Sequence, residues 1–97
     1  MTLQIPSRDL SLLRSALAQM PFMRARKVWV FGSRARGDAR ANSDLDLLLD
    51  EGLGLGELGE LREALEQSDI SLKIDLVRME DLSTDYRARI ESDKILL

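Results

Sequence analysis

Two short apolar runs constrain the fold of this chain more than any other feature. The first, residues 27–31, is rich in β-branched and aromatic side chains and ends at Gly32, which predicts a buried strand. The second, residues 45–50, begins just after Asp44 and predicts another strand. The twelve residues from 32 to 43 could join antiparallel neighbours or just reach a parallel crossover. We favour the antiparallel pairing, because it places the turn at Gly32 beside Asp44.

Alternation along the second strand places Asp44 and Asp46 on one face and the intervening leucines on the other. A third strand is predicted at residues 70–79, with Asp75 in its middle between apolar neighbours. An unpaired carboxylate at such a position is costly unless it faces water, a cation or a metal. Asp75 is therefore a candidate partner of the two earlier aspartates.

Apolar residues at helical spacing predict the remaining elements. Helices are expected over residues 7–20, with Ser7 as the N-cap, 57–67 and 82–91, and a C-terminal edge strand over residues 95–97. Residues 33–40 could form at most two helical turns. The fold class is α/β: a small mixed β-sheet with flanking helices, packed mainly on one face so that the other is left for ligands. Trp29 and Tyr86 are interpreted as core residues by spacing.

The length, the residue composition and the net charge exclude several classes of protein. A length of 97 residues indicates one domain, 1–97, and no apolar run approaches the ~20 residues of a membrane span. We therefore expect a cytoplasmic protein. Cysteine and histidine are both absent, which leaves carboxylates and oxygen-binding metals for any chemistry. The net charge of −3 argues against direct nucleic-acid binding, although residues 24–40 hold six basic side chains against one acidic one.

The aspartates and the turn suggest chemistry on phosphates. Residues i and i+2 of a strand lie about 6.5–7 Å apart on one face, so Asp44 and Asp46 can converge on hard cations. With Asp75 as a third carboxylate, this is an arrangement that holds two Mg²⁺ ions for phosphoryl-type transfer. Gly32 permits close approach of a ligand, and Ser33 can cap the next turn or donate to a phosphate oxygen. Taken alone, an Asp-x-Asp pair is more often two solvated acids at the start of a strand. A Gly-Ser turn alone is more often an ordinary capped turn.

Two further features need interpretation. Arg34 and Arg36 lie inside the motif, and we expect both to contact phosphate, since arginine offers a planar fork to anionic oxygens. Residues 54–59 form a literal G-x-G-x-x-G, the pattern of dinucleotide-binding loops. The acidic residues around it would repel a pyrophosphate, so we interpret it as a surface turn leading into a helix.

The combination of Gly-Ser, ten residues, Asp-x-Asp and a later apolar-Asp-apolar strand is far more specific than its parts. It resembles the polymerase-beta-like nucleotidyltransferases, and within them the minimal nucleotidyltransferases of prokaryotes. The matching segments are residues 31–37, 43–47 and 74–76, and the likeness covers essentially the whole chain. The resemblance implies that Gly32, Ser33 and Arg36 bind the nucleotide together with Asp44 and Asp46. It also implies that Asp44, Asp46 and Asp75 are catalytic and bind two Mg²⁺ ions.

The resemblance further implies transfer of a nucleoside monophosphate, AMP from ATP, to a hydroxyl. Family members of this size are paired with a small helical HEPN-domain toxin, so the implied role is an antitoxin that adenylylates its partner ribonuclease. Two alternatives stay open: a catalytically vestigial module that neutralises a partner by stoichiometric masking, and a transferase acting on a small molecule. The sequence also leaves open which base the nucleotide carries and which molecule accepts the nucleotide. It leaves open the oligomeric state as well, and a homo-oligomer is one of the options.

Overall fold

The computed structural model describes residues 3–97 and contains one mixed sheet of four strands in the order β3-β2-β1-β4. Strand β1 (Val28–Phe31) pairs antiparallel with β2 (Leu45–Leu49), the pairing that we favoured because it places the turn at Gly32 beside Asp44. Strand β2 pairs parallel with β3 (Ile74–Arg78), and the short edge strand β4 (Ile95–Leu96) pairs antiparallel with β1. The predicted mixed α/β sheet is confirmed.

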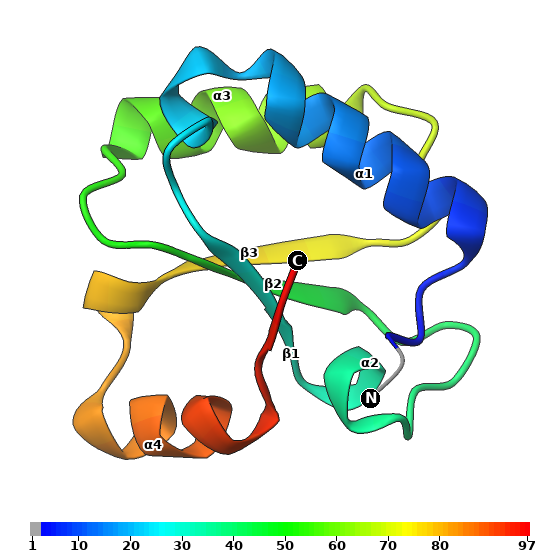
Figure 1. Cartoon of the computed structure of the whole chain (residues 1–97), viewed down its shortest axis with the longest axis vertical. Coiled ribbons are helices and arrows are strands. Elements are labelled where there is room, and N and C mark those ends of the chain that lie inside the picture. Colours follow the sequence, from blue (N-terminus) through cyan, green and yellow to red (C-terminus); the bar gives the residue numbers. More distant parts are fainter. Residues whose placement is uncertain (1–2) are drawn as a thin grey trace.

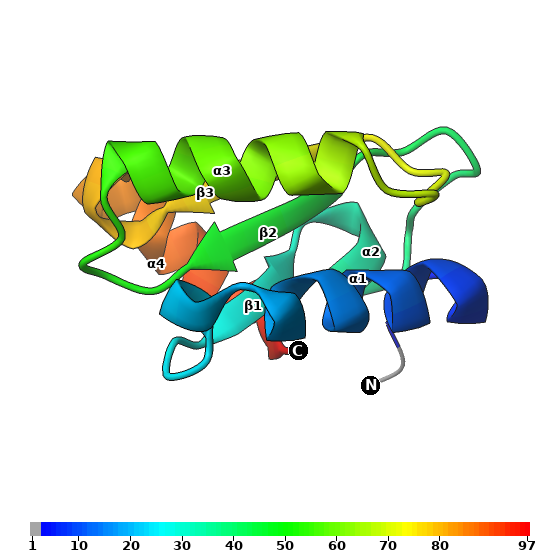
Figure 2. The same cartoon turned by 90° about the horizontal axis from the view of Figure 1, so that it is seen from above.

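Helices α1 (Ser7–Gln19) and α3 (Leu55–Glu66) cover one face of this sheet (Figures 1 and 2). Alternation along the strands sends half of their side chains to this face, where they meet the apolar stripes of the two helices. The result is one large apolar cluster with fully buried leucines at its centre, namely Leu13, Leu45, Leu47, Leu49 and Leu61. This cluster is the main core of the protein.

The opposite face carries α2 (Ser33–Arg36) and α4 (Thr84–Asp93) (Figure 1). Phe31 and Leu48 point to this face and pack against Ile90, the buried residue of α4. From the sequence, we expected this face to be left for ligands. Apolar side chains at Phe31 and Leu48 instead draw α4 over part of it, because exposing them to water would cost free energy.

Several element boundaries differ from the predictions, and those of α1, β3 and α4 have identifiable reasons. The N-cap of α1 is Pro6, and Ser7 is already its first helical residue. Strand β3 begins at Ile74 rather than residue 70, because the Ser71 N–H donates to Asp9 Oδ1 (3.0 Å) instead of joining a β-ladder. Helix α4 begins at Thr84 rather than residue 82, because the Ser83 side chain accepts a hydrogen bond from the Tyr86 N–H (3.2 Å).

Helix α3 begins two residues before the predicted start, so the glycines of the G-x-G-x-x-G pattern lie at its N-cap and in its first turns. The Gly54 N–H donates to Glu57 Oε1 (3.0 Å), so one backbone N–H at the start of the helix has a hydrogen-bond acceptor. Two single turns of 3-10 helix, Pro21–Met23 and Met79–Asp81, complete the connections. No helix within residues 3–97 is both long and apolar enough to cross a membrane.

Candidate active site

Gly32 follows β1 directly and has a backbone conformation that only glycine adopts readily. Its φ is +75°, and a Cβ built on it would collide with Asp46 Oδ2. The neighbouring residue Phe31 is the register partner of Asp46 in the antiparallel pair. The glycine is therefore required twice, for the backbone angle and for the close approach, and together these bring the Gly-Ser turn against the Asp46 carboxylate.

The third predicted carboxylate arrives from the parallel strand. Asp75 on β3 is the register partner of Asp46 on β2, so the two side chains start from adjacent positions of one ladder. Asp44 lies just before β2, where the Leu45 N–H donates to the Lys73 carbonyl (2.8 Å) and ties this end of β2 to β3. The structure thus brings together residues that are 29 positions apart in the sequence, Asp46 and Asp75.

The electrostatics of Asp46 reflect this crowding. Partial burial is the largest cause that raises the pKa of Asp46, and the neighbouring carboxylates of Asp75 and Asp44 add to it. Against a smaller opposing influence of Arg36, together they raise this pKa from 3.8 to about 6. The ion pairs within residues 3–97 are made by other acidic side chains. The negative charge of the aspartate cluster is therefore left without a cationic partner in hydrogen-bond contact.

Carboxylate oxygens in excess of cations fit a hard divalent metal such as Mg²⁺. Within residues 3–97, however, no three acidic side chains lie close enough to form a ready-made metal site. Mg²⁺ commonly uses only one or two carboxylates and takes its remaining ligands from water and substrate phosphates. The donor set of Asp44, Asp46 and Asp75 fits that mode of binding rather than an all-protein cage.

The two arginines of the motif have different roles, and the prediction that both contact phosphate is wrong for Arg34. Arg34 is 5% exposed and donates to backbone carbonyls, including those of Gln4 (2.6 Å) and Ser43 (3.0 Å). It holds the loop that leads into Asp44. Arg36 is exposed and forms ion pairs with Asp38 (3.4 Å) and Asp93 (3.2 Å).

A pocket of about 400 Å³ joins the turn, Asp46 and α4. From the predicted site it takes Gly32, Ser33, Arg36 and Asp46; Phe31 and four residues of α4, namely Tyr86, Arg89, Ile90 and Asp93, complete its lining. No function was predicted for α4 from the sequence. The prediction that Tyr86 is a core residue is wrong, since Tyr86 is 46% exposed. The signal that could have found this wall is the helical spacing of residues 86, 89, 90 and 93.

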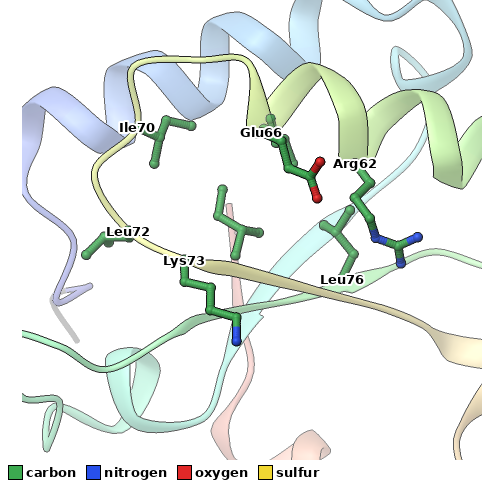
Figure 3. Close-up of a pocket in the computed structure, with 8 residues that line it drawn as sticks. Arg62, Glu66, Ile70, Leu72, Lys73 and Leu76 are labelled. Atoms are coloured by element: carbon green, nitrogen blue, oxygen red, sulfur yellow. The ribbon is translucent and has the colours of Figure 1, made fainter.

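Another cavity, of about 250 Å³, lies between α3 and β3 (Figure 3). It is lined by Leu72, Ile74 and Leu76, which point to the α1–α3 face, and by charged side chains such as Arg62 and Glu66. Asp46 and Asp75 project from the other face of the sheet. This cavity therefore shares no residue with the aspartate cluster.

Residues 16–97 match the family described as polymerase beta, nucleotidyltransferase. A relative from Haemophilus influenzae, named as a probable protein adenylyltransferase MntA, is 33% identical over 97 aligned residues that cover 98% of this chain and 83% of that protein. A solved minimal nucleotidyltransferase is 34% identical and superposes with a TM-score of 0.71 over 93% of this chain and 94% of its own. A chain solved in a toxin–antitoxin complex with AMP-PNP is 24% identical and superposes with a TM-score of 0.64. The match spans 90% of this chain and 67% of the other, and at this identity it shows a likeness of fold alone.

Proposed function

The chain belongs to the polymerase-beta nucleotidyltransferase family, and on this premise we propose that it transfers AMP from ATP to a hydroxyl group of a partner protein. The observation that carries the proposal is the parallel register of Asp46 and Asp75 beside the Gly32 turn. It places acidic residues from two strands next to a turn that accommodates only glycine. The relative that aligns over 98% of this chain and is named a probable protein adenylyltransferase supports AMP as the group transferred and a protein as the acceptor.

Each residue of the predicted site has a role in this proposal. Gly32, Ser33 and Arg36 bind the triphosphate: Ser33 can donate its hydroxyl, and Arg36 can offer a guanidinium fork. Asp44 and Asp46, with Asp75, would hold two Mg²⁺ ions. When bound, these ions supply positive charge against the triphosphate and the leaving pyrophosphate.

The reaction itself is a simple displacement. The acceptor oxygen forms a bond to the α-phosphorus of ATP, the bond from that phosphorus to the β-phosphate oxygen breaks, and pyrophosphate leaves. The acceptor proton passes to a carboxylate, for which we propose Asp75, since the chain has no histidine. Asp75 is exposed, so it can be reached by a hydroxyl on another protein. Such transfer depends chiefly on positioning and charge neutralisation, which this arrangement of rigid strands favours.

For the acceptor we propose a small helical HEPN-domain toxin, which makes this chain the antitoxin of a pair. The support is the likeness of the motif residues to the minimal nucleotidyltransferases and the likeness of fold to a chain solved in a toxin–antitoxin complex. Covalent modification by such an enzyme would inactivate many toxin molecules per antitoxin. Stoichiometric masking would require equal amounts of the two proteins.

The experiment incubates the purified protein with ATP, Mg²⁺ and a candidate HEPN-domain partner protein, and measures the intact mass of that partner. We expect a gain of one or more AMP units. The D44N/D46N double variant should lose at least about 1,000-fold in rate, since both carboxylates are needed for charge neutralisation. An E60Q/D69N variant, which removes the same charge from exposed positions in α3 and just after it, is the matched control and should react normally.

Two results would contradict the proposal. If the wild-type protein forms a stable complex with the partner but adds no mass to it, masking is the mechanism. If the D44N/D46N variant modifies the partner as fast as the wild type does, the assigned site is wrong.

A further inference from the structure

One face of α4 is turned towards the predicted active site. Tyr86, Arg89, Ile90 and Asp93 follow helical spacing and line the same pocket as Ser33 and Asp46. Ile90 is 4% exposed and anchors the helix on Phe31 and Leu48. Because Ile90 is held in that cluster, the neighbouring positions on the same face are directed into the pocket.

The arginines on the two sides of this pocket differ in their partners. Arg36 already forms ion pairs with Asp38 and Asp93. The guanidinium of Arg89 is absent from the ion pairs and side-chain hydrogen bonds formed among residues 3–97. An exposed, unpaired guanidinium facing a pocket that already contains Ser33 can bind phosphate oxygens without first breaking an ion pair.

Tyr86 lies one turn before Arg89 and is positioned by the cap of the helix. Its N–H donates to Ser83 Oγ (3.2 Å), and the residue is 46% exposed and lines the pocket. An aromatic ring held at a ligand pocket is a platform on which a nucleobase can stack, with an affinity contribution that does not depend on which base it is. The order along α4, ring first and guanidinium one turn later, matches a ligand with an aromatic end and an anionic end.

We infer that α4 supplies a second wall of the nucleotide site, in which Arg89 binds the phosphates of the nucleoside triphosphate and the Tyr86 ring stacks on its base. The inference rests on the proposed function and deepens it. It assigns nucleotide binding to a helix that lies outside the Gly-Ser and Asp-x-Asp motifs. It also makes Arg89, rather than Arg36 alone, a source of affinity for the triphosphate.

The test measures the dissociation constants of a non-hydrolysable ATP analogue and of adenosine by calorimetry, at one Mg²⁺ concentration. For R89A we expect about a tenfold loss for the ATP analogue and no change for adenosine, because only the phosphates lose a charge-assisted contact. For Y86A we expect about a tenfold loss for both ligands, and for Y86F no change, because stacking needs the ring and not the hydroxyl.

The matched control is R87A, which removes the same charge from the same helix. Arg87 pairs with Glu51 (3.4 Å) and is not among the residues that line the pocket. R89K keeps the charge and serves if R89A fails to fold; it should lose less affinity than R89A. Thermal unfolding of each variant shows whether α4 is still folded.

The inference is overturned if folded R89A binds the ATP analogue as tightly as R87A does, or if R89A weakens adenosine and the ATP analogue equally. Its failure can be told apart from failure of the proposed function. If the wild type binds the analogue and adenylylates its partner while R89A and Y86A do the same, only the assignment of α4 is wrong. If the wild type binds no nucleotide, both proposals fall.

Discussion

The two faces of the sheet are built from the same strands and yet have opposite character. On the α1–α3 face, Leu45, Leu47 and Leu49 are fully buried in a continuous apolar core. On the α2–α4 face, Asp46 of the same strand stands among carboxylates beside a glycine turn, and the apolar cluster there is small. Strand alternation alone separates them, because successive side chains point to opposite faces. The α1–α3 face stabilises the fold, and the α2–α4 face holds the residues for which we propose a catalytic role.

The comparison is sharpest between two carboxylates. Asp9, on the α1 side, is 2% exposed, and the Ser71 N–H and hydroxyl donate to its two oxygens (3.0 and 2.6 Å). These hydrogen bonds lower the pKa of Asp9, whereas burial and neighbouring acids raise the pKa of Asp46 to about 6. A satisfied carboxylate stabilises the native state, and a crowded, unpaired one destabilises it.

The largest effect is expected for a substitution on the α1–α3 face. The L47A substitution removes a fully buried side chain from the main core. We expect it to lower the free energy of unfolding by about 3 kcal/mol, from lost burial and a residual cavity. Urea unfolding measures this, and the molecules that remain folded should still bind nucleotide. A loss of nucleotide affinity greater than the loss of folded protein would show that the two faces are not independent.

The next largest effect is expected for a substitution on the α2–α4 face. The G32A substitution forces a Cβ into Asp46 Oδ2 and strains a residue whose φ is +75°. We expect the catalytic efficiency to fall by about 100-fold or more, because the turn and the carboxylate must separate. The rate of partner modification measures it, and G59A is the control, since a Cβ at this glycine of α3 meets nothing within 4 Å. Equal losses in the two variants would remove the special role of Gly32.

A smaller effect is expected from D9N, which weakens the hydrogen bonds that Asp9 accepts from Ser71. We expect a loss of about 2 kcal/mol at neutral pH, the range for hydrogen bonds to a charged group. Because the pKa of Asp9 is lowered from its usual 3.8, this stabilisation is present above that pH and is lost as the pH falls through the folded-state pKa. Wild type and D9N should therefore converge in stability at acid pH. A constant difference down to pH 2 would contradict this account.

The smallest effect has the opposite sign. The pKa of Asp46 is raised from 3.8 to about 6, so the folded state holds its proton more tightly than the unfolded chain does. Metal-free stability should then fall as the pH rises from about 4 to about 6 and stay low above that range. We expect D46N to be more stable than the wild type at pH 8 by about 1 kcal/mol, reduced from the full shift because the side chain is partly exposed.

Thermal unfolding with and without Mg²⁺ provides the check on this last prediction. Added Mg²⁺ should stabilise the wild type and leave D46N nearly unchanged, since the charge that the metal neutralises is missing from the variant. A D46N variant less stable than the metal-free wild type at pH 8 would contradict the assignment of Asp46 as a crowded carboxylate.

Much of the predicted architecture is confirmed by the structure, and the misses have local causes. The antiparallel β1–β2 pair and the edge strand at Ile95–Leu96 agree with the predictions, because strong apolar runs bounded by turn residues specify them. The predicted start of β3 was wrong because a side chain of α1 binds the Ser71 N–H, a contact across 62 positions. Arg34 was misassigned for the same reason: its partners include Gln4, thirty residues away.

The sequence by itself determined which residues carry the chemistry that we propose. The order Gly-Ser, arginine, Asp-x-Asp and a later apolar-Asp-apolar strand is local information, since spacing along a strand decides which side chains share a face. Tertiary structure alone decided which of these residues meet. The parallel register of β2 and β3 places Asp75 beside Asp46, and the packing of Ile90 brings α4 to the pocket. The burial of Arg34 gives it a different role from that of the exposed Arg36. Those outcomes depend on packing between distant segments, which no local pattern encodes.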